Sequence, residues 1–585
     1  MMRPTLSCLA LVLLAAPLWA AGDVNLCDVP GEAPDVILGD LQGVSRLGAV
    51  DGIAAFSVGS TECNLGTCWL DYFAATARHP VFTMNLHRIE NGRFRQLGMG
   101  WAVHRYLALS SPVCSTACEP TSGTHLGVAC STTDSSSING AQFRAGPRSE
   151  IDASDGSFPF PATDLNTEGD AIYKRLQVAE SELDPALHPG ARYFLEGQLV
   201  APDDAEFGNG ANNVSFLEVA AVPLGEGFTL VPVGQATVGK TALSEWSAEP
   251  GVVTSTLDLP GDGRILVASQ VSELGAGRRR YDYVIQNVNS QRAVRSLSIP
   301  LPVQADAGAF EFGDVDYHSG DPVDGTDWQV SAGGPGFPRA VVWQTPAFEA
   351  DPSANAVRWG TAYGFAFETD APATAGAVTL EYFRPGAPGG ATAAAVVPLL
   401  CDADGVCGAL EDPCACPDDC GPAPGSEGSC DDGIDDDCDG RPDCLDVDCC
   451  SLGACASVDA DGDTALACED CDDGDGAIWS VPGEAEDLRL RPWGGTVTRL
   501  DWLAPADPGA TEYAFEVIRS DTAADFVQSA ACLAPPSLAS EEFDADVPTG
   551  GSTFYYLVRA VNACPGGDGT AGSGSAAERI VTDCP

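Results

Sequence analysis

Hydrophobic and polar residues alternate with a period of two wherever a clear pattern exists between residues 22 and 398. Val378-Thr-Leu-Glu-Tyr382 is the plainest case, and such alternation predicts a strand with one buried and one wet face. Stretches of the same character lie at residues 52–58, 191–200, 281–287 and 359–367. Glycines and prolines separate them closely. We therefore predict an all-β, multidomain protein whose head, residues 22–398, consists of β-sandwiches with few, short helices and a soft boundary near residue 245 (243–251).

Clean alternation returns from about Pro482 to the end of the chain. Three stretches carry it, at residues 500–502, 513–519 and 556–562, and Trp502, Tyr513 and Tyr556 supply large apolar faces. These stretches resemble three strands of a fibronectin type III domain. The resemblance covers residues 481–585 and implies a small sandwich that acts as a spacer or presents a ligand. A tyrosine hydroxyl in such a domain is expected to reach a backbone partner.

The region between these two parts, residues 399–480, has no pattern that could build a hydrophobic core. From Cys401 to Gly476 the chain has 24 Asp and Glu residues, thirteen cysteines and one basic residue, Arg441. We call residues 399–480 the Cys/Asp segment and predict an irregular linker that disulfides and calcium hold together. The alternative is a solvated, self-repelling acidic tail, but a disordered tail has no use for so many cross-links.

One stretch of this segment has the spacing of a calcium loop. Residues 435–446 place aspartates at positions 1, 3, 5, 9 and 12, with Gly440 at position 6 and Arg441 at position 7. Alternating oxygen ligands around a sharp glycine turn suit Ca²⁺, which takes six to eight oxygens. The predicted calcium-binding residues here are Asp435, Asp437, Asp439, Arg441, Asp443 and Asp446.

A second, less complete set follows at Asp459, Asp461, Asp463, Asp470 and Asp472. Together with Cys430 to Gly440 it resembles the calcium repeats of thrombospondin type 3 and related aspartate-rich motifs of bacterial surface proteins. The cysteines from Cys401 to Cys420 resemble a short cysteine-rich module found beside such repeats. Their alternative use is a zinc thiolate site, which an oxidising compartment disfavours because thiols pair there.

The first 21 residues read as a secretory signal peptide. Arg3 precedes an apolar run, and the small residues Ala20 and Ala21 follow it. No later stretch is long and apolar enough to predict a membrane span. Removing Cys8 with the signal leaves 22 cysteines, of which six lie in 27–130, thirteen in 401–471 and three in 532–584. Groups of thirteen and three cysteines cannot each pair completely within themselves, so we predict one disulfide between these two groups. Cys63 and Cys68 are expected to form a disulfide that closes a short loop.

Charge narrows the choice of partners. The net charge of −55 argues against nucleic acid, whose binding depends on Lys and Arg contacts to phosphates. An exported acidic chain instead suggests an extracellular polysaccharide or protein as partner.

A catalytic centre has one weak candidate in the head. On a strand, Asp314, Asp316 and His318 would project from one face, with Asp327 nearby, which suits a metal or an acid–base pair. The plainer interpretation is a solvated turn containing a histidine. Other histidines are His79, His87, His104, His125 and His188. The metalloprotease helix pattern, the nucleophile elbow and the P-loop are absent from the sequence.

Two stretches of the head, residues 79–101 and 315–328, resemble an uncharacterised family of secreted bacterial proteins. That family implies no activity. The sequence thus predicts a secreted or cell-surface calcium-binding protein with a binding, adhesive or structural role. The alternative is an extracellular hydrolase whose catalytic domain is 22–398 and whose calcium and fibronectin-like parts are accessory.

Overall fold

The computed structural model describes most of the head, part of the Cys/Asp segment and most of the C-terminal region. In the head it describes Cys27, 32–162, 169–302, 305–332 and 340–400. In the Cys/Asp segment it describes 401, 406–408, 410–411, 413–426, 428–430, 437–438, 449, 465–466, 470 and 476–480. Beyond that it describes 481–494, 496–523, 526–527, 530–533, 536–548, 552–564, 581 and 584.

The protein is all-β and divides into two compact units. The first contains residues 1–300, 305–332 and 341–399, and the second contains the remainder, chiefly 400–585. Each unit is described below by itself.

The first sandwich of the head faces a four-stranded sheet with a seven-stranded one. The smaller sheet has the order β1 (Val36–Val50), β2 (Ile53–Asn64), β10 (Leu176–Ala179), with β8 (Ser131–Asp134) paired to β2. The larger has the order β13 (Gly227–Pro232), β12 (Val214–Leu224), β11 (Arg192–Val200), β4 (Val81–Glu90), β6 (Ala102–His104), β9 (Ala145–Gly146), with β5 (Arg93–Met99) paired to β4. Phe56, Phe82 and Leu195 belong to the fully buried core between them, which is the main source of stabilisation in such a fold.

The second sandwich contains two five-stranded sheets. One has the order β14 (Val253–Asp258), β15 (Arg264–Gly275), β16 (Arg278–Asn287), β21 (Thr361–Thr369), β18 (Ala307–Gly313). The other has the order β19 (Gln329–Ala332), β20 (Ala340–Gln344), β17 (Val294–Pro300), β22 (Ala373–Tyr382), β23 (Gly390–Pro398). Aromatic rings fill the space between them: the Trp343 ring lies 5.7 Å from Phe365 and 6.2 Å from Phe367, centroid to centroid.

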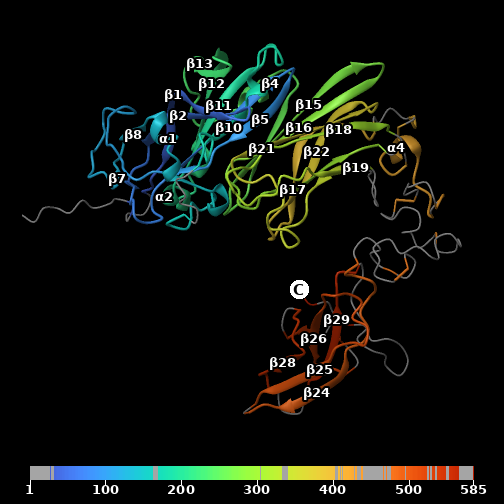
Figure 1. Ribbon diagram of the computed structural model, residues 1–585. Helices are drawn as coiled ribbons and strands as arrows, with labels where there is room; N and C mark the ends of the chain where they lie inside the picture. The colour runs from blue at the N-terminus through green and yellow to red at the C-terminus, as the bar shows by residue number, and fades with distance from the viewer. Residues whose placement is uncertain are drawn as a thin grey trace, which may run out of the picture. The chain divides into compact units, whose positions relative to one another are not determined.

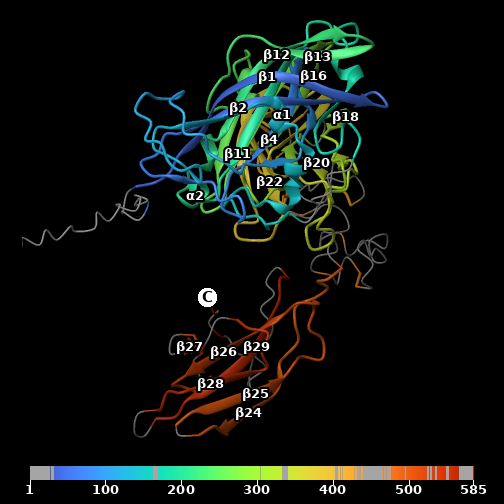
Figure 2. The same cartoon turned by 60° about the vertical axis from the view of Figure 1, so that its left-hand side comes forward.

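The two sandwiches pack against each other through the seven-stranded sheet and the sheet that contains β16. Phe94, Phe194, Trp246 and Val284 are buried together at this contact. Trp246 comes from α3 (Leu243–Ser247), the short helix that connects the two sandwiches, and its indole N–H donates to the Gly92 carbonyl at 2.7 Å. The head is therefore a stack of four sheets, as Figures 1 and 2 show.

Short elements complete the head. A two-stranded sheet pairs β3 (Leu70–Asp71) with β7 (His125–Leu126). The remaining helices span four or five residues in α1 (Ser136–Asn139) and α2 (Pro202–Glu206), and three or four in η2 (Gln142–Arg144), η3 (Arg148–Glu150), η4 (Glu180–Leu183) and η5 (Gly210–Asn212). Helices are thus short throughout the described head.

The second unit contains a small sandwich after the Cys/Asp segment. Its two sheets have the orders β24 (Glu486–Pro492), β25 (Thr498–Leu503), β28 (Glu541–Asp544) and β27 (Ala530–Cys532), β26 (Ala514–Ser520), β29 (Tyr555–Val561). Trp502, Phe515 and Val558 form its core, against which Tyr513 and Tyr556 pack. In the Cys/Asp segment the described residues include one helix, α4 (Pro417–Cys420).

The strand predictions are confirmed. Strands occupy nearly all of the eight stretches in which alternation is clear, from β2 to β29. The stretch from Asp314 to His318 is irregular because β18 ends at Gly313. Among the described helices none has the length and apolar character needed to cross a membrane.

Candidate functional site

His318 is held by its neighbours. One ring nitrogen, Nε2, lies 2.8 Å from the Met99 carbonyl and therefore donates to it, while Nδ1 lies 2.9 Å from the Ser319 hydroxyl and accepts. Burial lowers the pKa of His318, although the Met99 carbonyl opposes that shift. A neutral imidazole with both nitrogens engaged positions the loop 314–319 against β5.

The carboxylates predicted to act with His318 face solvent or bind other groups. Asp316 and Asp327 are exposed, whereas Asp314 accepts a hydrogen bond from Asn355 Nδ2 at 2.5 Å. Burial raises the pKa of Asp314, and the charges of Asp327 and Asp316 raise it further. An open cavity of ≈ 790 Å³ contains Asp314, Asp316 and His318 but not Asp327. The structure thus brings three of the four residues together without an acid–base contact between them.

His79 and His104 form a buried pair. His79 Nε2 lies 2.8 Å from His104 Nδ1, and His79 Nδ1 lies 3.3 Å from the Phe73 carbonyl. Phe158 and Phe160 surround both rings with centroids 5.2–6.2 Å away. Burial lowers the pKa of His79 to about 4 and that of His104 to about 3, so both are neutral at physiological pH.

The remaining histidines contact carboxylates. His87 Nε2 lies 3.3 Å from Glu196 Oε1 between the two sandwiches. Burial alone would raise the pKa of Glu196, but His87, the Ala242 amide and Gln286 outweigh it and lower the pKa. His125 contacts Asp71 at 3.4 Å, and His188 contacts Glu90 at 2.9 Å. Sequence spacing does not reveal these contacts, because each joins segments far apart in the chain.

Of the two aspartates at the start of α2, Asp204 is buried and Asp203 is half-buried. Asp204 accepts from the Val36 amide and the Asn213 side chain, and Asp203 Oδ2 accepts from the Asp71 amide at 2.7 Å while its Oδ1 has no partner. Burial raises the pKa of each carboxyl to about 7. Both are therefore partly protonated near neutrality, which is unusual for aspartate.

We expect Asp203→Asn to stabilise the head at pH 8 by about 1–2 kcal/mol and to have little effect at pH 4. Protonation of the Asp203 carboxyl favours the folded wild-type protein, because its folded-state pKa lies above the unfolded value of 3.8. This contribution to stability is complete at low pH and is lost as the pH rises through about 7. Urea denaturation of the full-length protein at the two pH values measures this. Equal effects at pH 4 and pH 8 would contradict it.

The calcium-binding residues predicted from sequence fall almost entirely outside the described residues. These are Asp435, Asp439, Arg441, Asp443, Asp446, Asp459, Asp461, Asp463 and Asp472. The structure describes Asp437, which is half-buried, and Asp470, which is buried. The calcium loop therefore stays a prediction.

Every cysteine in the described part of the chain is in a disulfide. The pairs described are Cys27–Cys68, Cys63–Cys114, Cys118–Cys130, Cys401–Cys416, Cys407–Cys420, Cys414–Cys438, Cys430–Cys449 and Cys532–Cys584. The predicted clip between Cys63 and Cys68 is wrong, because each pairs with a distant cysteine. Cys564 is also disulfide-bonded, to a partner outside the described residues, so the predicted bridge to the Cys/Asp segment stays a prediction.

The cysteines proposed as alternative zinc ligands all form disulfides. Cys401, Cys416, Glu411 and Asp419 do lie within 4.8 Å of one another, but Cys401 and Cys416 are bonded to each other. Zinc binds thiolates, and a disulfide offers none. This cluster therefore does not fit zinc.

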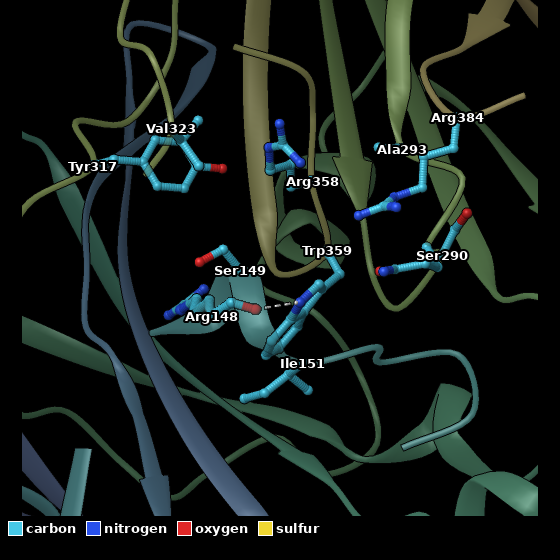
Figure 3. A pocket seen from close by; sticks show the side chains of 11 residues that line it. Arg148, Ser149, Ile151, Ser290, Ala293, Tyr317, Val323, Arg358, Trp359 and Arg384 are labelled. Atoms are coloured by element: carbon cyan, nitrogen blue, oxygen red, sulfur yellow. Dashed lines mark hydrogen bonds between the residues drawn. The ribbon is translucent and has the colours of Figure 1, made fainter. Parts of the chain in front are cut away.

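A pocket that the sequence does not indicate lies where loops of the second sandwich meet η3 (Figure 3). The polar groups that surround it come from Arg148, Ser149, Ser290, Tyr317, Arg358 and Arg384. Ile151, Ala293, Val323 and Trp359 supply the apolar wall. Its cavity volume is ≈ 20 Å³, far below the roughly 300–1,000 Å³ of a drug-sized ligand site, so only a small group of atoms fits it. The Arg148 guanidinium is buried and already donates to the Gly100, Gly360 and Met84 carbonyls. Arg358 and Arg384 are therefore the cations that make the pocket suited to an anion.

Comparison with known proteins finds distant likenesses among solved structures. No protein-family model and no curated protein matches the chain. Among solved structures, the N-terminal domain of a Streptococcus gordonii adhesin is 8% identical, with a TM-score of 0.15 over 63% of this chain and 98% of that one. The Corynebacterium diphtheriae major pilin SpaA is 11% identical, with a TM-score of 0.14 over 82% and 86%. Neither likeness carries a functional inference.

Proposed function

We propose that this chain is an exported multidomain β-protein that binds an extracellular polysaccharide or protein through its head. In this proposal the Cys/Asp segment binds calcium and joins the head to a fibronectin-like spacer. The observation that carries it is the disulfide bonding of every described cysteine, in both compact units. Disulfides form and persist in oxidising compartments outside the cytosol.

The described chemistry of the head supports binding over hydrolysis. His318 has both ring nitrogens engaged, and His79 and His104 are hydrogen-bonded to each other in an apolar site. A general base needs a free lone pair within reach of a substrate proton. The residues first considered as catalytic thus serve to hold the fold, whereas the arginine pocket offers donors suited to recognition.

Calcium is proposed from charge as well as from spacing. With 24 acidic residues and one basic residue between Cys401 and Gly476, the cross-linked segment would repel itself without a counter-ion. A divalent cation among Asp435, Asp437, Asp439, Asp443 and Asp446 removes that repulsion. Extracellular calcium modules bind with dissociation constants of about 10⁻⁴–10⁻³ M, so the segment is expected to be loaded outside a cell.

Removing calcium is expected to make the Cys/Asp segment the first site of proteolysis. Repulsion among the freed carboxylates would open the backbone between residues 401 and 480 while the disulfides prevent complete separation. Limited proteolysis with and without a chelator, read by mass spectrometry, locates the first cuts. Titration calorimetry of the chelated protein with calcium measures the affinity.

A matched pair of variants assigns the effect. Asp435→Asn with Asp439→Asn should weaken calcium binding and reproduce the cleavage pattern of the chelated protein, whereas Asp258→Asn, an exposed aspartate of the head, should do neither. Identical cleavage with and without chelator, together with no heat of calcium binding, would exclude the proposed role of the segment.

A further inference from the structure

Arginines of this chain are generally paired with carboxylates. In the described residues, most have a carboxylate oxygen within 4.0 Å, as Arg192 has Glu218 and Arg280 has Glu311. Arg148, Arg358 and Arg384 have no such ion pair among the described residues, although the chain has a net charge of −55. These three arginines line the same pocket, whereas the other described arginines without such an ion pair, Arg95, Arg144, Arg175 and Arg292, do not line it. The pocket therefore gathers three arginines that form no close ion pair with a carboxylate of the described residues.

Backbone carbonyls and aromatic rings hold these arginines instead. Arg148 donates to the carbonyls of Gly100, Met84 and Gly360 at 2.7–3.1 Å. Arg358 donates to the carbonyls of Pro352 and Ala354. These contacts fix the guanidinium groups without neutralising their charge. The positive charge of the pocket is therefore preorganised, which lowers the cost of ordering them when an anion binds.

Arg384 is the arginine most available to a ligand. Its guanidinium carbon lies 4.8 Å from the centre of the Phe348 ring, and its hydrogen bonds within the described protein come from its backbone, which pairs with Arg292. Burial lowers the pKa of Arg384, and the like charge of Arg358 lowers it further, although Asp152 opposes the shift. The two cations repel each other, so an anion between them would relieve an unfavourable interaction.

One neutral donor and two acids complete the surroundings. The Tyr317 hydroxyl is buried and is directed toward the pocket (Figure 3), whereas the Ser149 hydroxyl donates to the buried Asp321. Asp321 acts electrostatically on Arg148 and Arg358, and Asp152 acts on Arg384. Among the described residues no guanidinium nitrogen lies within 4.0 Å of the oxygens of either acid, so the cations of the pocket lack a close carboxylate partner.

We propose that this pocket binds the oxyanion group, a carboxylate or a sulfate, of an acidic extracellular ligand. Guanidinium groups present paired N–H donors that match two oxygens of such a group. Tyr317 donates to a remaining oxygen, and Ile151, Ala293 and Val323 contact the adjoining uncharged part of the ligand. The proposal deepens the function proposed above, because it gives the head a ligand chemistry.

The position of the pocket in the fold agrees with this role. Its residues come from η3 and from the loops β16–β17, β18–β19, β20–β21 and β22–β23. Loops at one end of a β-sandwich commonly carry binding residues, because the sheets beneath hold them in place. The cavity volume of ≈ 20 Å³ admits only a small charged group, so the rest of the molecule that bears it would lie outside the pocket.

Titration calorimetry of the full-length protein in calcium-containing buffer tests the proposal. The probes are sodium galacturonate, sodium sulfate and, as the uncharged counterpart, galactose. We expect one or both anions to bind and galactose not to bind, and the two anion arms show whether a carboxylate or a sulfate is preferred. Failure of both anions to bind more tightly than galactose would overturn the inference, and would leave the calcium result above untouched.

Variants locate the binding. Arg384→Gln should weaken anion binding by at least about tenfold, since it removes a charge-assisted contact, and should not lower the melting temperature because it also removes a like-charge repulsion. Tyr317→Phe should weaken binding less. Arg264→Gln makes the same change of charge at an exposed ion pair with Asp258 and should leave binding unchanged. Anion binding that survives in Arg384→Gln and in the double variant with Tyr317→Phe would overturn the inference.

Discussion

Replacing Arg105 with leucine is expected to lower the free energy of unfolding of the head by roughly 3–5 kcal/mol. The Arg105 side chain is 1% exposed, and its guanidinium contacts Glu62 at 3.0 Å, Ser60 at 2.7 Å and Asp134. Glu62 is itself 1% exposed. Without the guanidinium it would remain as a buried carboxyl whose pKa burial already raises. Urea denaturation of the full-length protein at pH 7 measures the loss.

Two further variants show whether charge causes that loss. Adding Glu62→Gln to Arg105→Leu removes the uncompensated charge and keeps a hydrogen-bonding partner for Tyr72, so we expect it to recover part of the stability. Arg264→Leu breaks the exposed pair with Asp258 and should cost less than about 1 kcal/mol. If Arg105→Leu cost no more than Arg264→Leu, the buried cluster would not stabilise the head as described.

The strands of the head could be predicted because burial imposes a local pattern. Along β22, Val378, Leu380 and Tyr382 are buried while Thr379 and Glu381 are exposed, which is the alternation visible in the sequence. The stacking of four sheets could not be predicted. It depends on residues such as Phe94 and Trp246, which come from β5 and α3 and meet residues of the second sandwich only after folding.

Local spacing misled for one disulfide and did not decide the structure of one loop. For Asp314, Asp316 and His318 a strand face was weighed against a turn; β18 ends at Gly313, and Asp314 binds Asn355, which lies 41 residues later. Cys63 lies on β2 beside β1, where Cys114 can reach it, so its nearness in sequence to Cys68 is irrelevant. In each case a contact between distant segments replaced the local one.

The arginine pocket shows the same limit for function. Arg148, Arg358 and Arg384 are separated by up to 236 residues in sequence and have no common spacing, since they come from η3 and from two loops of the second sandwich. A metal loop differs, because its ligands must lie on one short segment. Sequence reasoning therefore found the candidate calcium loop and missed the pocket.

Acid is expected to destabilise the head through the His79–His104 pair. Their pKa values of about 4 and about 3 lie below the usual histidine value of 6.5, so the unfolded chain takes up protons that the folded chain does not. Their contribution to stability is therefore complete above pH 6.5 and falls as the pH drops toward 4. Between pH 7.5 and pH 5 the pair should remove about 4 kcal/mol of the free energy of unfolding.

The double variant His79→Phe with His104→Phe isolates this effect. Phenylalanines suit a site already formed by Phe158 and Phe160, and they cannot take up a proton. Asp203 and Asp204 act in the opposite direction, because their raised pKa values favour the folded state as the pH falls. The relevant measurement is thus the difference between wild type and variant in urea denaturation at pH 7.5 and pH 5.

His188→Gln, which changes a partly exposed histidine, should lose as much free energy of unfolding between pH 7.5 and pH 5 as the wild type does. NMR titration of His79 and His104 in the wild-type protein provides a test even if the double variant fails to fold, and imidazole pKa values near 6.5 would contradict the explanation.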